Sequence, residues 1–260
     1  MISWAGHGED QILRRILSER TPGTYIDIGA AHPKFGSVTF ALYQAGWSGI
    51  AIEPRRELSA VWKNLRPKDL LIEAALTIEG KAGFMTRQGF RSHFVKENEN
   101  LNNTALSKTN AISTTDLTLI MKDQFSLEPT LVKIDVEGNE FSITKNLLEN
   151  KVRPEIWLIE VIDQFESEHI RRDSSWSMRE LLEAHNYELK LFDGVNEWYV
   201  ISNSESIDRN IWAPAYPGVE NFIPFHLTLN YRTRHLINRW RRKIKGKIAR
   251  IFKQSKQRHE

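Results

Sequence analysis

Residues 24–53 read TYIDIGAAHPKFGSVTFALYQAGWSGIAIE and contain a strand, a helix and a second strand in succession. Residues 24–29 are a short apolar run that ends at a glycine, which is typical of a buried strand. A helical pattern follows at 38–45, and residues 49–53 form the next buried run. This order predicts a right-handed βαβ unit and therefore two parallel strands.

The same alternation continues along the chain. We predict further strands at 70–75, 130–136, 156–162, 187–192 and 198–201, and further helices at 8–19, 55–65, 139–149 and 177–185. Only a short turn separates the last two strands, so they are predicted to form an antiparallel hairpin. A mostly parallel sheet that ends in such a hairpin is the α/β plan of the Rossmann-like class I methyltransferases. The less regular span 80–129 is expected to be an elaborated connection on the substrate side.

Charge divides the chain into two parts. Of its 36 basic and 33 acidic residues, 12 basic and one acidic lie in 230–260, which leaves 24 basic and 32 acidic residues before them. We therefore predict one methyltransferase-like domain at 1–226, which is acidic, and a basic C-terminal helix or tail at 227–260. The tail accounts for the high isoelectric point, so a nucleic-acid partner is not expected.

Several classes of protein are excluded by composition. The chain has no cysteine, so disulfides and thiolate metal sites are ruled out. No apolar run approaches the roughly 18–20 residues of a membrane span. The first ten residues lack the basic start and apolar stretch of a secretory signal, so a cytoplasmic location is expected.

The ends of the first two predicted strands point to a nucleoside cofactor. The first ends Asp27-Ile28-Gly29-Ala30, where a glycine lets the backbone approach a ligand closely. The second ends at Glu53, whose carboxylate can accept hydrogen bonds from both ribose hydroxyls. A nicotinamide cofactor requires G-x-G-x-x-G to cradle its pyrophosphate, and the second and third glycines are missing here. S-adenosylmethionine has no phosphate, so this loop favours it over a dinucleotide.

Acidic residues also follow the central strands. Asp135 is expected at the carboxyl edge of the sheet, where it would orient the cofactor, bind a metal or act as a base. Glu137 is either a second catalytic acid or a partner for the start of the next helix. Glu160 ends an apolar strand, and a carboxylate there is costly unless it is paired or functional. Asp135 and Glu160 could share a divalent cation such as Mg²⁺, or form a hydrogen-bonded pair without metal.

The basic tail has a second pattern. Apolar residues, among them Trp240 and Phe252, recur at helical spacing in 236–252, and lysine and arginine fill most of the remaining surface. A basic amphipathic helix of this kind is typical of binding to anionic membrane surfaces. Residues 230–256 are therefore predicted to hold the protein at the inner face of a membrane. The alternative is a helix that packs on the domain.

Taken in order, these motifs resemble the FkbM-type methyltransferases. The resemblance covers about residues 3–220 and rests on GEDQIL at 8–13, YIDIGA at 25–30, SVT at 37–39, GWSG at 46–49, IEP at 52–54, LVKIDVEG at 131–138 and FDGVN at 192–196. It implies a class I fold, S-adenosylmethionine as the methyl donor and O-methylation of sugars, surface glycans or secondary metabolites.

The resemblance assigns Asp27, Gly29 and Glu53 to the cofactor and makes Asp135 an active-site acid. Ala30 in the same loop is included among the cofactor contacts. The family often has asparagine after its D-x-G-A motif, where this chain has Ala31 and then His32.

The expected function is therefore methylation of a sugar hydroxyl in a glycan, nucleotide sugar or glycosylated metabolite. One alternative is an NAD-dependent sugar-modifying enzyme. Another is a non-catalytic membrane or nucleic-acid adaptor with a vestigial cofactor fold.

Overall fold

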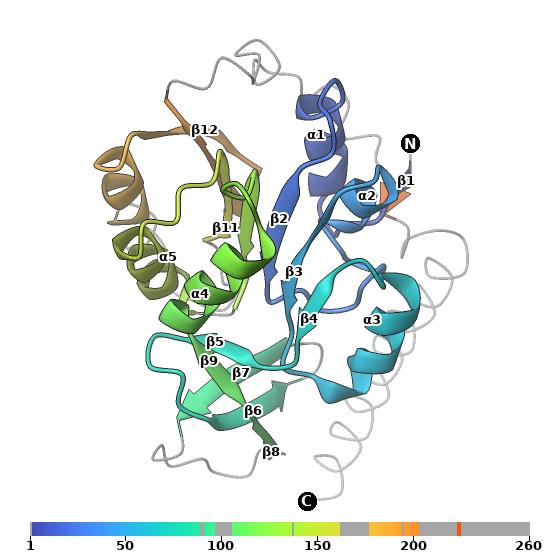
Figure 1. The fold of residues 1–260 in the computed structure, drawn as a ribbon, viewed down its shortest axis with the longest axis vertical. Helices are drawn as coiled ribbons and strands as arrows, with labels where there is room; N and C mark the ends of the chain where they lie inside the picture. Colours follow the sequence, from blue (N-terminus) through green and yellow to red (C-terminus); the bar gives the residue numbers. More distant parts are fainter. Residues whose placement is uncertain are drawn as a thin grey trace, which may run out of the picture.

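The computed structural model describes residues 2–88, 91–96, 106–136, 138–161, 177–193, 195–202 and 223–224. At its centre is a seven-stranded sheet with the order β12-β13-β11-β10-β2-β3-β4 (Figure 1). The strands are β2 (Thr24–Ile28), β3 (Ser48–Ile52), β4 (Leu70–Ile72), β10 (Leu131–Ile134), β11 (Ile156–Glu160), β12 (Tyr187–Phe192) and β13 (Asn196–Ile201). All neighbouring pairs are parallel except those that β13 makes with β11 and β12. The predicted class I sheet with its terminal hairpin is confirmed.

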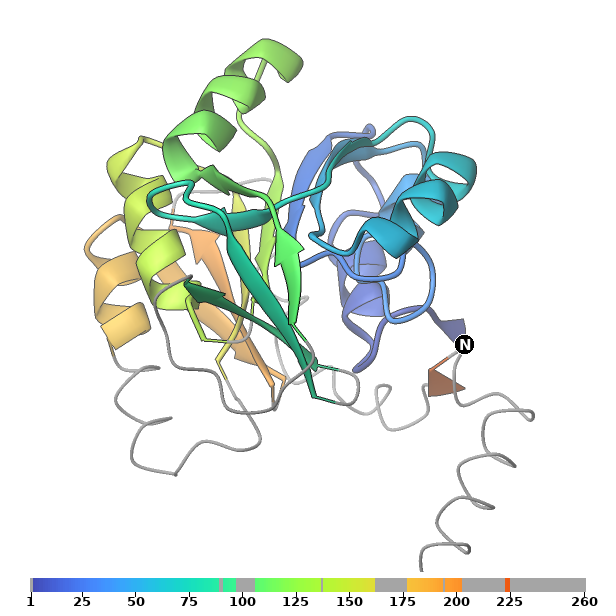
Figure 2. The same cartoon turned by 90° about the horizontal axis from the view of Figure 1, so that it is seen from below.

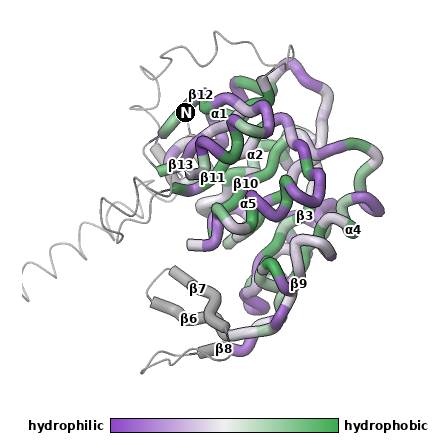
Figure 3. The backbone as a smooth tube through the Cα atoms, turned by 90° about the vertical axis from the view of Figure 1, so that its left-hand side faces the viewer, coloured by the Kyte–Doolittle hydropathy of each residue, from purple (hydrophilic) through white to green (hydrophobic). Residues whose placement is uncertain are grey.

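Successive side chains of each strand enter two different cores. Tyr25 of β2 packs with α1 (Glu9–Ile16) and with residues around α2 (Phe40–Gln44), whereas Ile26 packs with α4 (Thr114–Gln124) and α5 (Glu140–Glu149). We name these the α1/α2 face and the α4/α5 face of the sheet. Figure 3 shows hydrophobic residues concentrated along the central strands.

The same alternation places three charged side chains on one face. Asp27 lies between Ile26 and Ile28, both of which belong to the α4/α5 face, so Asp27 belongs to the α1/α2 face. Lys133 of β10 and Glu160 of β11 follow the same rule, since their neighbours in the strand also pack on the α4/α5 face. The carboxyl end of the α1/α2 face is therefore polar, although the rest of that face is apolar.

The connection between β4 and β10 is more structured than the sequence indicated. Strands β5 (Ala75–Thr77) and β9 (Ala111–Ser113) form a short parallel pair. The chain between them forms a separate antiparallel sheet of three strands, in the order β7-β6-β8. These are β6 (Gly83–Gln88), β7 (Arg91–Lys96) and β8 (Leu106–Thr109), seen beside the β5–β9 pair in Figures 1 and 2. The predicted strand at 70–75 is thus divided, because β4 ends at Ile72 and Ala75 begins a strand of another sheet.

Helix α4 was not predicted, although its start carries a local signal. The Ser113 hydroxyl accepts a hydrogen bond from the amide of Asp116, and the Asp116 carboxylate accepts one from the amide of Ser113. This reciprocal arrangement is a capping box, which satisfies two amide groups that the helix leaves free at its start. The helix brings Leu117 and Met121 into the core beneath the sheet.

The beginning of the chain lies beside a segment from far along the sequence. Strand β1 (Ile2–Ser3) pairs in parallel with β14 (Ile223–Pro224), next to the N-terminus in Figure 1. Within the described part of the chain, no helix combines the length and the apolar character needed to cross a membrane. The predicted tail at 227–260 lies outside the described residues, so the boundary at 226 stays a prediction.

Candidate active site

Gly29 follows β2 at the point where three strands end. Its φ of +74° is in the left-handed region, and a Cβ atom at this position would lie 1.7 Å from the backbone oxygen of Asp135. The sequence predicted that a ligand approaches the backbone closely at Gly29, and the structure shows that the end of β10 approaches it closely. Only glycine fits here, because any side chain would push β10 away from β2.

The loop after Gly29 uses most of its amide groups within the protein. Gly29 and Ala30 both donate to the carbonyl of Ile52, at 3.0 and 3.1 Å. The amide of Ala31 donates to the Glu53 carboxylate, and the amide of Gly36 donates to the carbonyl of Trp4. The amides of Lys34 and Phe35 both donate to Nδ1 of His32. A cradle for a pyrophosphate needs such amides to point at the ligand, and in this loop they are already engaged.

Glu53 is buried and accepts four hydrogen bonds. The donors are the amide of Ala31 at 2.7 Å and three groups of Arg55, namely its amide at 2.9 Å, Nε at 2.8 Å and Nη2 at 3.2 Å. A carboxylate offers about four acceptor positions, so the set is complete. Glu53 directly follows β3, as predicted, and Arg55 supplies three of its four donors.

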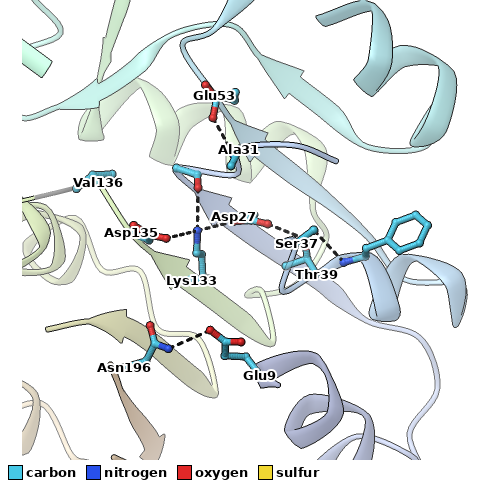
Figure 4. Close-up of polar contacts among 12 residues, drawn as sticks. Glu9, Asp27, Ala31, Ser37, Thr39, Glu53, Lys133, Asp135, Val136 and Asn196 are labelled. Carbon is cyan, nitrogen blue, oxygen red and sulfur yellow. Dashed lines mark hydrogen bonds and ion pairs between the residues drawn. The ribbon is translucent and has the colours of Figure 1, made fainter. Parts of the chain in front are cut away.

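Lys133 lies between the two acids at the centre of the site (Figure 4). Its Nζ is 2.8 Å from the carbonyl oxygen of Gly29 and 3.3 Å from one carboxylate oxygen of each of Asp27 and Asp135. Burial by itself would lower the pKa of Lys133, but the carboxylates of Asp135 and Asp27 outweigh it and raise the pKa above its usual range. The ammonium therefore stays charged and ties together the ends of β2 and β10.

A second layer of polar groups holds Asp27 from behind. The Thr39 hydroxyl donates to Oδ2 of Asp27 at 2.6 Å and accepts from Nη1 of Arg66 at 3.0 Å. Arg66 is almost fully buried and forms an ion pair with Asp69, which also accepts from Tyr25. Thr39 thus connects Asp27 of β2 to the buried ion pair of Arg66 and Asp69.

A row of acids and amides continues across the carboxyl edge from Asp135. Ile134 of β10 aligns with Ile159 of β11, so Asp135 and Glu160 take the next position in register. Glu160 lies opposite Asn196 in the antiparallel pairing of β11 with β13. The side-chain Nδ2 of Asn196 donates to Oε1 of Glu9 at 3.2 Å (Figure 4). Burial raises the pKa of Glu9, and the neighbouring carboxylate of Asp193 adds to this effect.

Two of the predicted roles have no counterpart in the described residues. Glu137 lies outside them, so both of its predicted roles stay predictions. Glu140, at the start of α5, accepts from the amides of Val136 and Gly138. In the described part of the chain, no group of three or more histidine, aspartate or glutamate side chains could hold a metal ion. Asp135 and Glu160 are neighbours in register, but this part of the structure gives no support to a cation between them.

Sequence reasoning placed Asp27, Gly29, Ala30, Glu53 and Asp135 at one edge and missed the groups that organise them. Lys133 had a visible signal, because a lysine inside the apolar run 130–136 must find a partner if it is buried. Glu9 and Asn196 belong to two motifs of the family pattern, but the sequence does not show that these motifs meet. Thr39 belongs to the SVT motif of the family pattern, but the sequence does not show that its hydroxyl contacts Asp27 and Arg66.

Comparison with solved structures finds distant likenesses only. An O-methyltransferase from Bacillus cereus in complex with SAH is 13% identical, with a TM-score of 0.40, 74% of this chain and 76% of that chain covered. CalS11, a TDP-rhamnose 3'-O-methyltransferase of calicheamicin biosynthesis, is 12% identical, with a TM-score of 0.41 and coverages of 74% and 76%. Monomeric WbdD is 13% identical with a TM-score of 0.41, and the match spans 75% of this chain but only 39% of WbdD. At these scores the likenesses carry no argument about activity.

Comparison of the sequence is more decisive. No curated protein matches the chain significantly. The family model of the methyltransferase FkbM domain, however, matches residues 27–189. This span runs from the first acid of the site, through the Gly29 loop, Glu53 and the Lys133-Ile134-Asp135 segment, to the start of the terminal hairpin. It covers more than half of the chain, so the protein belongs to the FkbM methyltransferase family and is an S-adenosylmethionine-dependent methyltransferase.

Proposed function

We propose that the protein transfers the methyl group of S-adenosylmethionine to a hydroxyl oxygen of a sugar. The acceptor would be a glycan, a nucleotide sugar or a glycosylated metabolite, with surface polysaccharide biosynthesis as the favoured setting. When it is bound, S-adenosylmethionine supplies an electrophilic methyl group and leaves as S-adenosylhomocysteine.

The observation that carries the choice of cofactor is the state of the loop amides. Six amides of residues 29–36 donate to acceptors within the protein, so they are not arranged to cradle a pyrophosphate. The site instead presents carboxylates, at Asp27, Glu53 and Asp135. Carboxylates suit the ribose hydroxyls, the ammonium and the sulfonium of S-adenosylmethionine, whereas they would repel the phosphates of NAD.

Each residue has a chemical task in this proposal. Glu53 accepts the ribose hydroxyls once the side chain of Arg55 has moved aside. Gly29 and Ala30 allow the methionine part to approach the backbone. The side chain of Asp135 is 39% exposed. It accepts the proton of the acceptor hydroxyl while the oxygen of that hydroxyl attacks the methyl carbon of the cofactor.

Glu160 supports Asp135 in this scheme, because it is the next acid in register across the sheet. Glu137 is retained as a further catalytic candidate. We derive no step through a metal ion, since the described residues do not assemble a set of ligands.

Methyl transfer to a panel of nucleotide sugars and glycans tests the proposal. Asp135→Asn keeps the shape of the side chain and removes the base, so the rate should fall by about 10²–10⁴-fold. Exhaustive chelation should leave the native rate unchanged. Near-normal rates for Asp135→Asn would refute the assignment of the base.

Binding measurements test the cofactor separately. The free protein should bind S-adenosylhomocysteine and should bind NAD more weakly or not at all. Tighter binding of NAD would replace this proposal with the NAD-dependent sugar-modifying alternative. Binding of neither cofactor would favour the adaptor with a vestigial site.

A further inference from the structure

Lys133 contacts both acids at the ends of β2 and β10, Asp27 and Asp135. Its ammonium donates a hydrogen bond to the carbonyl oxygen of Gly29 at 2.8 Å and forms ion pairs, at 3.3 Å, with one carboxylate oxygen of each of Asp27 and Asp135. The side chain is only 9% exposed. These contacts hold the ammonium in place, and the raised pKa keeps it protonated, so Lys133 does not serve as a base.

Stability alone does not explain a buried lysine at this position. Removing an ammonium from water is costly, and well-packed apolar residues often stabilise a protein as well as a buried ion pair does. The neighbours of Lys133 on the same face of β10 and β11, Leu131 and Leu158, show that apolar side chains fit this part of the core. The charge itself is therefore what distinguishes Lys133 from its neighbours.

The charges of the three side chains do not cancel. Two carboxylates and one ammonium leave a single net negative charge at the ends of β2 and β10. S-adenosylmethionine carries a sulfonium, an ammonium and a carboxylate, so its net charge is one positive unit. S-adenosylhomocysteine has lost the sulfonium charge and is neutral overall.

We propose that Lys133 is a positioning residue that sets how strongly the site prefers S-adenosylmethionine over S-adenosylhomocysteine. The inference rests on the proposed cofactor. Lys133 holds the Gly29 loop against β10, and it reduces the negative charge of the acid pair to one unit. A site with two uncompensated carboxylates would hold the sulfonium too firmly in the ground state, because that charge is lost from sulfur during transfer.

The ratio of the two dissociation constants separates charge from shape. The two compounds differ only at the sulfur, so a purely structural change alters both affinities by the same factor. Lys133→Met adds one uncompensated negative charge, so the ratio should shift toward S-adenosylmethionine on the order of tenfold. Asp27→Asn removes one negative charge and should shift the ratio by a similar factor in the opposite direction.

Two variants serve as matched controls. Thr39→Val removes the hydrogen bond to Asp27 without changing any charge, so both affinities should fall together and the ratio should stay within twofold. Lys133→Arg keeps the positive charge and should also keep the native ratio. Calorimetric titrations at pH 8 measure all of these values.

Steady-state kinetics give a second readout. Lys133→Met should lower both kcat and the KM for S-adenosylmethionine, whereas a loss of structure would raise KM.

Equal losses of both affinities in Lys133→Met, with the ratio unchanged, would overturn the inference. If Lys133→Met does not fold, an unchanged ratio in Asp27→Asn has the same meaning. Failure of the native protein to bind either compound would instead refute the proposed cofactor, so the two failures are distinguishable.

Discussion

Glu53 and Arg55 form the most complete hydrogen-bonded pair of the cofactor site. Three of the four bonds to the Glu53 carboxylate come from Arg55, and two of these come from its guanidinium. The Arg55 side chain is 24% exposed, whereas that of Glu53 is 5% exposed. The arginine can therefore leave toward solvent while the carboxylate stays in place, and we propose that Arg55 competes with the ribose for Glu53.

Substitutions at these two residues should have opposite effects on cofactor affinity. Glu53→Ala leaves the ribose hydroxyls unpaired, and bonds to a charged acceptor contribute about 1.5–3 kcal/mol, so affinity should fall roughly 10- to 150-fold. Arg55→Ala removes the competing donors and should strengthen binding by up to about tenfold. Titration with S-adenosylhomocysteine measures both. Weaker binding by Arg55→Ala would show that the arginine contacts the cofactor instead of competing with it.

Ala31 and His32 together replace the asparagine that the family often has after D-x-G-A. Ala31 adopts a φ of 53°, a left-handed conformation that asparagine tolerates better than alanine. Nδ1 of His32 accepts hydrogen bonds from the backbone amides of Lys34 and Phe35, as the side-chain oxygen of an asparagine does in a turn. This makes the neutral imidazole part of the loop structure, so His32 is not available as the general base.

The pH dependence of the loop should follow His32. Burial, with Arg55 and Lys34 nearby, lowers the pKa of His32 in the folded protein. Because folding lowers this pKa, the neutral imidazole of His32 stabilises the folded loop fully above the pKa of the unfolded chain, which is about 6.5. This stabilisation is lost as pH falls toward the pKa of His32 in the folded protein. Cofactor affinity of the native protein should therefore fall a few-fold between pH 7.5 and 5.5.

His32→Asn keeps an acceptor and does not titrate, so its affinity should change less over the same range. His185→Asn, in a different part of the fold, should behave like the native protein. Identical pH profiles for His32→Asn and the native protein would refute this role.

At the scale of elements, the structure joins the first helix to the last hairpin. The turn between β12 and β13 is closed by Asp193, which accepts from the amides of Val195 and Asn196 and from Nε1 of Trp198. Asn196 also donates to Glu9 at the start of α1. The GED and DGVN motifs are thus joined by a buried contact beside the carboxyl end of β11.

Asn196→Ala should uncouple these elements. The substitution removes the Nδ2 group that donates to both Glu9 and Asp193. Glu9 is only 5% exposed, so the free energy of unfolding should fall by about 1–3 kcal/mol. Urea denaturation measures the loss. Glu183→Ala, which breaks an exposed ion pair with Arg179, should change stability by no more than about 0.5 kcal/mol. Equal effects of the two variants would mean that the buried contact contributes little.

At the scale of the whole molecule, charge separates the domain from its tail. The first 229 residues carry 24 basic and 32 acidic residues, whereas 230–260 carry 12 basic residues and one acidic residue. An acidic domain is repelled by anionic lipid, so attachment would have to come from the tail. We propose that the amphipathic pattern at 230–256 binds the inner surface of a membrane and brings the enzyme to lipid-linked glycans.

Liposome co-sedimentation tests the tail. Each basic residue near an anionic surface contributes roughly 1 kcal/mol, so the full chain should bind anionic vesicles and ignore neutral ones. Truncation after Leu229 should abolish binding, and high salt should weaken it. Absence of binding to anionic vesicles at low salt would favour a helix packed on the domain.

The sequence by itself determined the sheet and the acids at its edge. The alternation of short apolar runs with helical patterns is local, and so are the positions where runs end, at Gly29, Glu53 and Asp135. Parallel strands bring their carboxyl ends to one edge, so these residues had to meet. The terminal hairpin followed from a connection too short for parallel strands. Helix α4 was missed even though its capping box is local, because the span around it lacks a clear apolar period.

Only the tertiary structure decided what those acids contact. Lys133 and Gly29 are 104 residues apart, and Asn196 and Glu9 are 187 residues apart. Such contacts depend on strand order and on the register between strands, and a shift of one residue would turn Lys133 to the other face of the sheet. The pairing of Arg55 with Glu53 was equally hidden, because it depends on side-chain rotamers. The sequence therefore determined where the charges gather, and the packed structure decided which of them are compensated.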